Sequence, residues 1–592
     1  MARNRFDVDE TLETPFSMKH LKRSFVYVKR QAGKMTVALL LSAASAVLTL
    51  FIPLLTQRAL DHSIPAKDVT ELCVIAASLV VCTLLSVLCI RFRAKIMSQV
   101  GNSIIYDMRN DLFIHLQKLP FSYYDDRPDG KILVRVVQYI NSVSDLLSNG
   151  IINFVMSVFN IIFITIFMFA THVQLSLVIL AGLPFLVAIL AFLKPFQRKA
   201  WQRVSNKSSN LNAYLAESIN GVRVTQFFVR ELENIGIFEK LSKNARHAWL
   251  RAVISTHSIG VFTAVVSSAV FCAVYLVGML TLGPGAITLG TLVAMTSYAD
   301  RFWQPITAIA NLYNSFMNTI SYLERIFETM DEPVTVCDAP DAEPLPPISG
   351  QVEYQNVTFG YEPDHPVLKN VSFHIKAGES IALVGPTGAG KTTIVNLLCR
   401  FYNLTGGKIL LDGHDISQST LHSLRSQLGI MLQESFIFSG TIADNIKYGR
   451  PDATDEEMIR AAKTVHADEF IREFEKGYDT EVNERGSRLS QGQKQLIALA
   501  RTLLTDPKIL ILDEATSSVD TKTERLMQEG LNRLMEGRTS FIIAHRLSTI
   551  KSCDKIMVVA DQGIAECGSH DELMEKKGAY YRLYTAQLSD MK

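Results

Sequence analysis

The stretch Gly385-Pro386-Thr387-Gly388-Ala389-Gly390-Lys391-Thr392 fits the pattern of a phosphate-binding loop and is the strongest indication of the fold. Residues 381–384 before the loop form an apolar run typical of a buried strand, and the mostly apolar residues 393–399 after it are typical of a helix. A strand, a glycine-rich loop and a helix in this order place backbone amides and a helix N-terminus around phosphate oxygens. The stretch therefore predicts a nucleoside triphosphate site that runs from Gly385 to Thr393.

Two side chains of the loop have predicted roles. Lys391 is expected to reach the terminal phosphates, and the hydroxyl of Thr392 is expected to hold Mg²⁺. The alternative interpretation is a glycine-rich turn that happens to precede a lysine. The strand and helix patterns on either side favour the phosphate-binding interpretation.

The composition bounds the class of protein. The chain has 592 residues, of which 48% are hydrophobic, and its formal net charge is +1. A balance so close to zero argues against nucleic acid as the main partner. The mean hydropathy of +0.17 is too high for an ordinary soluble enzyme and fits a membrane half joined to a soluble half. The eight cysteines are scattered without a CxxC pair, so neither a disulfide framework nor a cysteine metal site is predicted. No secretory signal is predicted, because the first fifteen residues are polar.

Apolar runs in the first half predict membrane-spanning helices, which need about 20 apolar residues each. A polar break at His172-Val173-Gln174 divides one long run into two spans. The six predicted spans lie near residues 35–55, 72–90, 151–171, 175–193, 253–277 and 286–306.

Basic residues in the loops predict the orientation. The segment before the first span and the long connections 91–150 and 194–252 are rich in Lys and Arg, so both termini and these connections are expected in the cytoplasm. The connections have helical patterns, so the membrane helices are expected to extend beyond the bilayer. The chain is expected to turn near Phe121–Ile140 and Asn212–Glu231. Residues 1–331 are thus predicted to be the transmembrane domain, 332–350 a Pro-rich linker, and 351–592 a nucleotide-binding domain.

Polar residues inside apolar spans suggest function, because their burial in lipid is unfavourable. The candidates are Asn153, Asn160, His257, Asp300 and Arg301. They either line a substrate pathway or, for Asp300 and Arg301, lie hydrated near the cytoplasmic end of a span.

Other predicted site residues follow strands of the second half. Residues 508–513 form an apolar run that ends in Asp513, which is expected to hold Mg²⁺, and Glu514 after it could polarise an attacking water. The apolar residues 541–544 precede His545, whose imidazole can hydrogen-bond a terminal phosphate. Residues 352–359 alternate apolar and polar side chains like a strand, and Tyr361 follows them; its ring either stacks on adenine or belongs to the core.

Taken together, these motifs resemble an ATP-binding cassette (ABC) exporter half-transporter of the multidrug or lipid-exporter type, over nearly the whole chain. By that resemblance Glu514 is the catalytic base, His545 the switch histidine, Gln433 the Q-loop glutamine that contacts Mg²⁺, and Tyr361 the adenine-stacking aromatic. Ser518-Val519-Asp520 matches the D-loop, and Leu489-Ser490-Gln491-Gly492-Gln493 is similar to the family signature, which makes Ser490, Gly492, Gln493 and Asp520 nucleotide-binding candidates. The turns near Phe121–Ile140 and Asn212–Glu231 resemble coupling helices.

The resemblance also implies a partner. In this family the signature of a second nucleotide domain closes the open face of the ATP, so the chain is expected to pair with another half-transporter, as a homodimer or a heterodimer. Two residues depart from the family pattern: Gln491 and Asn483 stand where glycine is usual. They leave open whether the two composite ATP sites are equivalent. Because Glu514 and His545 are present, this chain is expected to be a catalytically intact half.

The fold class implied is a membrane α-helical domain of six spans followed by an α/β P-loop ATPase domain. The expected function is the export of a hydrophobic or amphipathic substrate, driven by hydrolysis of ATP with Mg²⁺, across what is expected to be a bacterial plasma membrane. The alternative is an ATP-gated channel or a regulatory subunit without coupled transport. A soluble ATPase of the chromosome-maintenance kind is excluded by the six predicted spans.

Overall fold

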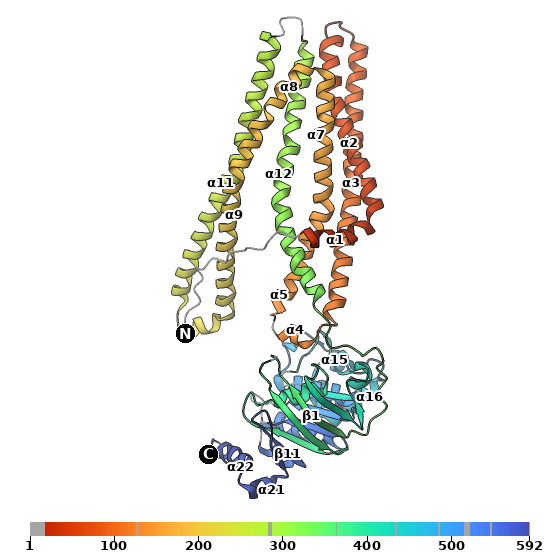
Figure 1. Cartoon of the computed structure of the whole chain (residues 1–592), viewed down its shortest axis with the longest axis vertical. Helices are drawn as coiled ribbons and strands as arrows, with labels where there is room; N and C mark the ends of the chain where they lie inside the picture. The colour runs from red at the N-terminus through yellow and green to blue at the C-terminus, as the bar shows by residue number, and fades with distance from the viewer. Residues whose placement is uncertain are drawn as a thin grey trace. The chain divides into compact units, whose positions relative to one another are not determined.

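The computed structural model describes residues 18–125, 127, 129–281, 287–362, 364–431, 435–483, 486–513, 521–544 and 547–590. The chain divides into two compact units (Figure 1). The first unit comprises residues up to Leu116 and Gly130–Asp331, and it is helical. The second comprises Gln117–Asp129 and the chain from Glu332 onward, and it is an α/β domain. The predicted order of a helical domain followed by an α/β domain is confirmed.

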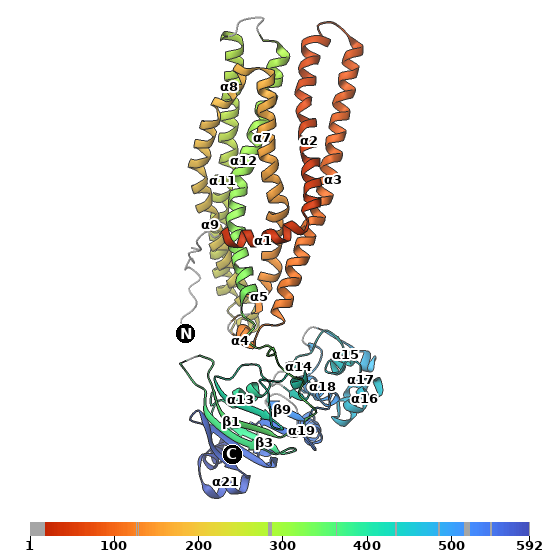
Figure 2. The same ribbon diagram turned by 45° about the vertical axis from the view of Figure 1, so that its right-hand side comes forward.

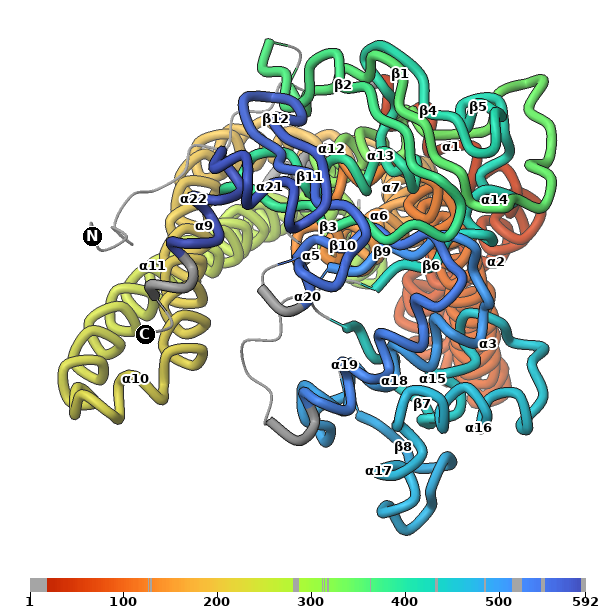
Figure 3. The backbone as a smooth tube through the Cα atoms, turned by 90° about the horizontal axis from the view of Figure 1, so that it is seen from below, coloured from red at the N-terminus to blue at the C-terminus, as the bar shows by residue number. Residues whose placement is uncertain are grey.

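The first unit consists of long helices joined by short connections. They are α1 (Met18–Arg30), α2 (Ala32–Arg58), η1 (Ala59–Ser63), α3 (Val69–Leu116), α5 (Asp129–Val134), η2 (Arg135–Tyr139), α6 (Ile140–Asp145), η3 (Leu146–Gly150), α7 (Ile151–Thr171), α8 (Val173–Ala181), α9 (Leu183–Asn220), α10 (Val222–Phe227), α11 (Glu231–Leu276), η4 (Val277–Thr281) and α12 (Leu289–Asp331). Figure 2 shows α2 and α3 side by side and α1 lying across the long helices. Figure 3 shows α10 at the turn between α9 and α11.

Five stretches of the described chain are long and apolar enough to cross a membrane. They are Ala32–Ser63, Val69–Leu116, Gly130–Thr171, Val173–Asn220 and Glu231–Met279. They contain the first five predicted spans, and the break at His172 falls between two of them. The sixth prediction, 286–306, falls on α12, which is not among the five, and residue 286 lies outside the described part.

The break at His172 has a local cause. Its backbone is extended (φ −162°, ψ 112°), and its Nδ1 accepts a hydrogen bond from the Leu175 amide at 3.4 Å, which caps α8. Nearby, a Cβ on Gly182 would lie 2.5 Å from Cγ2 of Val270 and 3.1 Å from the Trp303 ring. The junction of α8 and α9 therefore packs closely against both α11 and α12.

The polar residues singled out in the spans divide into two groups. Arg301 is half-buried and donates to the Thr49 carbonyl at 3.2 Å, which fastens α12 to α2, while Asp300 and His257 are exposed. Asn153 and Asn160 line a cavity of about 610 Å³ together with serines of α2 and α7. The bundle thus contains a polar cavity at the depth of the predicted spans.

The second unit contains two principal sheets. An antiparallel sheet has the order β2-β1-β4-β5, and a six-stranded sheet has the order β12-β11-β3-β10-β9-β6, in which all neighbours are parallel except β12. The strands are β1 (Val352–Phe359), β2 (Leu368–Ile375), β3 (Ser380–Val384), β4 (Gly406–Leu411), β5 (His414–Asp415), β6 (Leu428–Met431), β7 (Gly440–Thr441), β8 (Glu481–Val482), β9 (Ile509–Asp513), β10 (Thr539–Ile543), β11 (Lys555–Ala560) and β12 (Gly563–Gly568).

Helices cover this sheet on both faces. Alternate residues of β3 belong to different apolar clusters: Ala382 and Val384 to one, Ile381 and Leu383 to the other. A parallel sheet buried on both sides requires such a continuous apolar strand. The helices of the second unit, taken together, are α4 (Phe121–Asp125), α13 (Lys391–Leu398), α14 (Leu421–Arg425), α15 (Ile442–Lys447), α16 (Asp455–Thr464), α17 (Ala467–Glu473), η5 (Gly477–Asp479), α18 (Gln491–Leu504), α19 (Thr521–Met535), α20 (Leu547–Ser552), α21 (His570–Lys576) and α22 (Ala579–Asp590).

The segment 332–350, predicted to be a linker, has no helix but is packed onto the second unit. Arg400 donates to the Cys337 carbonyl at 2.9 Å, and the amide of Ile348 donates to Oε1 of Gln427 at 2.8 Å. Leu345 and Ile348 are buried in the apolar cluster that also contains β1. The segment therefore belongs structurally to the second unit.

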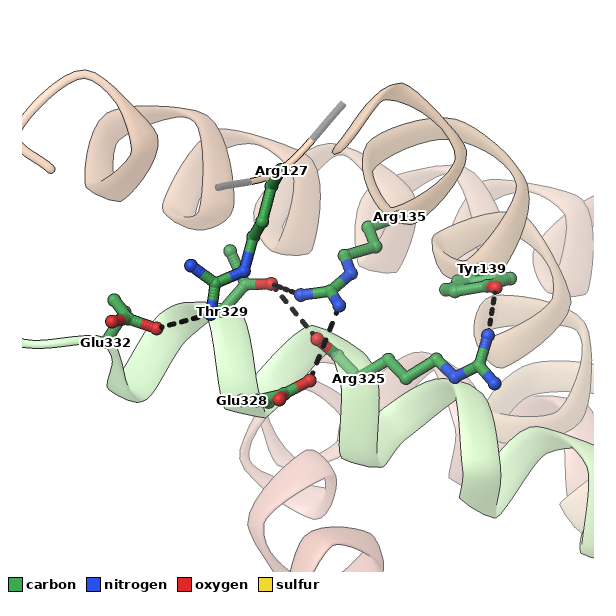
Figure 4. Close-up of polar contacts among 7 residues, drawn as sticks. All are labelled: Arg127, Arg135, Tyr139, Arg325, Glu328, Thr329 and Glu332. Carbon is green, nitrogen blue, oxygen red and sulfur yellow. Dashed lines mark hydrogen bonds and ion pairs between the residues drawn. The ribbon is translucent and has the colours of Figure 1, made fainter. Parts of the chain in front are cut away.

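The end of α12 is tied to η2 within the first unit (Figure 4). Arg135, whose side chain is 16% exposed, donates to Thr329 Oγ1 at 2.6 Å and pairs with Glu328 at 3.4 Å. Arg325 donates to the Tyr139 hydroxyl at 2.7 Å. These bonds hold the last turns of α12 against the segment that follows α5.

We predict that Arg135→Gln lowers the stability of the first unit by about 1.5–3 kcal/mol, because hydrogen bonds from a charged donor contribute that much. Thermal unfolding of the purified protein in detergent should show the change as a lower Tm. Lys131→Gln removes an exposed charge of α5 and is the control. Equal Tm values for the two variants would contradict the assignment.

Candidate nucleotide-binding site

The glycine-rich loop leaves the centre of the six-stranded sheet. It follows β3, which lies between β10 and β11, and it ends at the start of α13. Gly385 has φ +149°, and a Cβ there would lie 2.3 Å from the carbonyl oxygen of Val559. Gly390, with φ +105°, precedes α13. The loop turns closely against β11, and only glycine permits this turn at its first residue.

Lys391 is folded back over the loop. It is 8% exposed, and its Nζ donates to the carbonyl oxygens of Gly385 at 2.8 Å and Pro386 at 2.9 Å. Burial lowers the pKa of this ammonium group, while the charge of Asp513 acts in the opposite direction. The lysine is thus held by neutral carbonyl acceptors, and negatively charged phosphate oxygens can replace them with stronger bonds.

Asp513 lies at the same edge of the sheet as the loop. It is the last residue of β9 and is in register with Ile543 of β10, which is in register with Leu383 of β3. Thr392, in the first turn of α13, is exposed. A carboxylate and a hydroxyl are oxygen ligands of the kind that Mg²⁺ prefers, so this pair fits the predicted metal role.

The Tyr361 side chain is 50% exposed, and its hydroxyl and ring edge contact neighbouring side chains. Its hydroxyl lies 3.2 Å from Oγ1 of the buried Thr393, and its ring makes edge contacts with Phe359 and with Tyr402, at 5.0 and 5.2 Å between centroids. The exposure is what the adenine-stacking prediction requires, and the contact with Thr393 places the ring beside the start of α13.

The signature segment forms a helix start. Ser490 caps α18: its Oγ accepts from the Gln493 amide at 3.2 Å, and its own amide donates to Oε1 of Gln493 at 2.9 Å. Gly492 is buried, whereas Gln491 and Asn483 are exposed. The Gln493 side chain therefore orders the helix start, a role that the sequence prediction did not include. The exposed Gln491 does not disturb the cap.

Four predicted residues, Gln433, Glu514, Asp520 and His545, lie outside the described part of the chain, as does the rest of the D-loop. The described residues that come together are therefore Gly385 to Thr393, with Tyr361 beside α13 and Asp513 at the same sheet edge. Ser490, Gly492 and Gln493 lie at the start of a separate helix of the same unit.

A contact that the sequence prediction missed joins α4 to the nucleotide domain. The Phe121 and Phe401 rings lie 4.4 Å apart, and the Tyr402 hydroxyl donates to Asp125. Arg127 lies over the Tyr123 ring at 4.2 Å and donates to Glu332 at 3.3 Å (Figure 4). Because Tyr402 also touches Tyr361, one side chain connects the predicted adenine position with the segment predicted as a coupling region.

We predict that Gly385→Ala weakens ATP binding at least about tenfold, since the added Cβ collides with backbone that cannot move cheaply. Gly378→Ala is the control: Gly378 has φ +79°, but a Cβ there meets no atom within 4 Å. Binding of a fluorescent ATP analogue to the two purified variants measures the difference. Similar affinities would show that the contact with Val559 does not shape the loop.

We also predict that Tyr402→Phe accelerates amide exchange in residues 117–129 about fivefold, because a hydrogen bond contributes about 1 kcal/mol. Tyr361→Phe, which loses a hydroxyl bonded to Thr393 instead, should leave this segment unchanged. Asp125→Ala should have an effect that does not add to that of Tyr402→Phe. Fully additive effects would contradict a direct bond between the two side chains.

Comparisons with known proteins agree with this architecture. A family model for the ABC transporter transmembrane region matches residues 35–306, and a model for the ABC transporter matches residues 368–517. The uncharacterized ABC transporter ATP-binding protein YknV of Bacillus subtilis is 40% identical over 597 residues, covering 100% of this chain and 98% of the relative.

Two further similarities concern exporters and transport proteins. The fatty acid ABC transporter ATP-binding/permease protein of Mycobacterium bovis is 37% identical over 495 residues, covering 83% of this chain and 78% of the relative. The solved structure of a bacterial Atm1-family ABC exporter with ATP bound superimposes with a TM-score of 0.77 at 28% identity, over 95% of this chain and 98% of that one. The chain therefore belongs to the ABC transporter family, as an exporter half-transporter that spans the membrane several times and carries its ATPase domain in the same polypeptide.

Proposed function

We propose that this chain pairs with a second half-transporter and uses Mg²⁺-dependent ATP hydrolysis to export a hydrophobic or amphipathic substrate. The observation that carries the proposal is the loop from Gly385 to Thr393, folded at the carboxyl edge of a parallel sheet in a chain that also has five helical stretches apolar enough to cross a membrane. An ATPase site in the same polypeptide as a membrane bundle supports ATP-driven transport.

Along the sequence, the proposed domain division is residues 1–331 for the transmembrane domain, 332–350 for the connecting segment and 351–592 for the nucleotide domain. Residues 117–129 and 332–350 pack with the second compact unit. Both termini and the nucleotide domain are assigned to the cytoplasm, because Lys and Arg are concentrated before the first span and in residues 91–150 and 194–252. Relatives from bacteria support placement in a bacterial plasma membrane.

At the ATP site, we assign the terminal phosphates to Lys391 and the loop amides, and adenine to the exposed ring of Tyr361. Mg²⁺ would be held by Thr392, Asp513 and Gln433, and it would neutralise charge on the phosphate oxygens. Glu514 is assigned as the base that orients the attacking water, and His545 as a hydrogen-bond partner of the terminal phosphate.

The second half-transporter completes the site. The ordered start of α18, with the Ser490 cap and the buried Gly492, presents backbone amides and a helix N-terminus suited to a phosphate. We assign this surface, together with Asp520, to the ATP of the partner. ATP held between two nucleotide domains favours their closed arrangement, which supplies the differential affinity that a transport cycle needs. Both a homodimer and a heterodimer satisfy this requirement.

A hydrophobic or amphipathic substrate is supported by the lining of the helical unit and by one relative. Within that unit, the polar cavity lined by Asn153 and Asn160 offers hydroxyls and amides inside an apolar bundle. The relative from Mycobacterium bovis is named a fatty acid transporter, and a fatty acid is an amphipathic molecule. A polar group and an apolar body can both be accommodated by such a bundle.

We predict that Glu514→Gln lowers ATP turnover by about 10²–10⁴-fold and leaves ATP binding intact, because a positioned base contributes that factor. Glu575→Gln, an exposed residue of α21, is the control for the loss of one carboxylate. ATPase assays in lipid compare the turnover of the two variants, and ATP affinity is measured in parallel. Turnover of Glu514→Gln equal to that of the control would overturn the role of the base.

The same protein in liposomes tests transport. ATP-dependent movement of an acyl-chain probe that is abolished by Glu514→Gln supports export. An ATP-gated channel would instead pass its solute down a gradient with Glu514→Gln and bound ATP, and that result would replace the proposal.

A further inference from the structure

A second cavity of the helical unit has an uneven lining. It has a volume of about 640 Å³ and lies between α9 and α12, within the size range of pockets that hold small ligands. The α12 side is apolar and consists of Ile306, Ile309 and Ala310. On α9, Val187 and Leu190 continue this apolar wall within the predicted span 175–193.

The α9 side then changes from apolar to cationic. Lys194, Arg198 and Lys199 line the same cavity, directly beyond the predicted span. Leu190, Lys194 and Arg198 follow one another at four-residue intervals, so they lie along one face of the helix. With a rise of 1.5 Å per residue, the apolar and the cationic ends of this face are separated by about 12 Å.

The charge of the lining is of one sign. Among the described residues that border the cavity there is no Asp or Glu, and Arg198 and Lys199 are exposed. The guanidinium group of Arg198 can bind a carboxylate or a phosphate through two parallel hydrogen bonds. A ligand that satisfied the whole lining would combine an apolar chain with an anionic head.

We propose that the cavity between α9 and α12 binds the transported substrate, and that this substrate is an anionic amphiphile, an acyl chain with a carboxylate or phosphate head. The inference rests on the proposed export function and narrows its substrate class. The chain lies against Leu190 and the α12 wall, and the head lies at Arg198 and Lys199. A cationic amphiphile would meet repulsion at the head position, and a neutral one would leave the cations without a ligand.

The polar cavity lined by Asn153 and Asn160 in the same unit has a different lining from the cavity between α9 and α12. Ser45, Asn153 and Asn160 line it with hydroxyls and amides, and Arg93 is the cation among its lining residues. It lacks the transition from an apolar wall to several cations along one helix. Selection for an anionic head is therefore assigned to α9.

The test compares the double variant Arg198→Gln/Lys199→Gln with Arg203→Gln, which removes an exposed cation of α9 that does not line the cavity. The full-length dimer in nanodiscs of neutral phosphatidylcholine is titrated with three probes: oleate, oleoyl lysophosphatidic acid and oleyl alcohol. The first two distinguish a carboxylate from a phosphate head, and the third has a neutral head. ATP-dependent export of the same probes is measured in liposomes.

The expected result is at least about tenfold weaker binding of one or both anionic probes by the double variant, with unchanged binding of oleyl alcohol and with Arg203→Gln like the wild type. Export of the affected anion should fall with its binding. Equal losses for charged and neutral probes, or equal effects of the double and control variants, would overturn the proposal. Anion binding without ATP-dependent export of any anion would also overturn it.

The two proposals fail separately. If neither anion binds but ATP hydrolysis still depends on Glu514 and a neutral amphiphile is exported, the substrate class is wrong and the export function stands. If no probe is exported and hydrolysis does not depend on Glu514, the export function fails. Direct binding in nanodiscs then reports on the cavity independently of turnover.

Discussion

The second unit depends on one close backbone approach. The chain leaves β3 at Gly385, where a Cβ would lie 2.3 Å from the carbonyl oxygen of Val559, and it must turn there to begin the loop. Because β9, β10, β3 and β11 are parallel and in register, the same edge receives Asp513. The sheet is buried on both faces, and this packing holds the strand ends and therefore the site residues in place.

The aromatic side chains beside the loop extend this order outward. Tyr361 is positioned by Thr393 at the start of α13, and Tyr402 lies against Tyr361 while its hydroxyl binds Asp125. The segment 117–129 therefore packs with the nucleotide domain, although it lies far from that domain in the sequence.

The helical unit follows a different constraint. Its helices must be long and apolar enough for a bilayer, so the polar groups buried among them need hydrogen-bond partners inside the bundle. Arg301 is bonded to the Thr49 carbonyl, which gives it a structural role in joining α12 to α2. Arg198 and Lys199 instead border a cavity whose other wall is apolar, so they differ from Arg301, which joins two helices.

The local features could be predicted from the sequence: the loop between its strand and helix, the break at His172, the apolar spans and the order of the two domains. Each depends on neighbouring residues or on helical and strand periodicity. Contacts between side chains that are distant in the sequence could be seen in the folded chain alone. Asp125 and Tyr402 are 277 residues apart, the supposed linker is packed on the nucleotide domain, and the cavity of α9 exists because α12 faces it. Packing between remote segments leaves no periodic signal in the sequence, so the physical chemistry of single stretches could not reveal it.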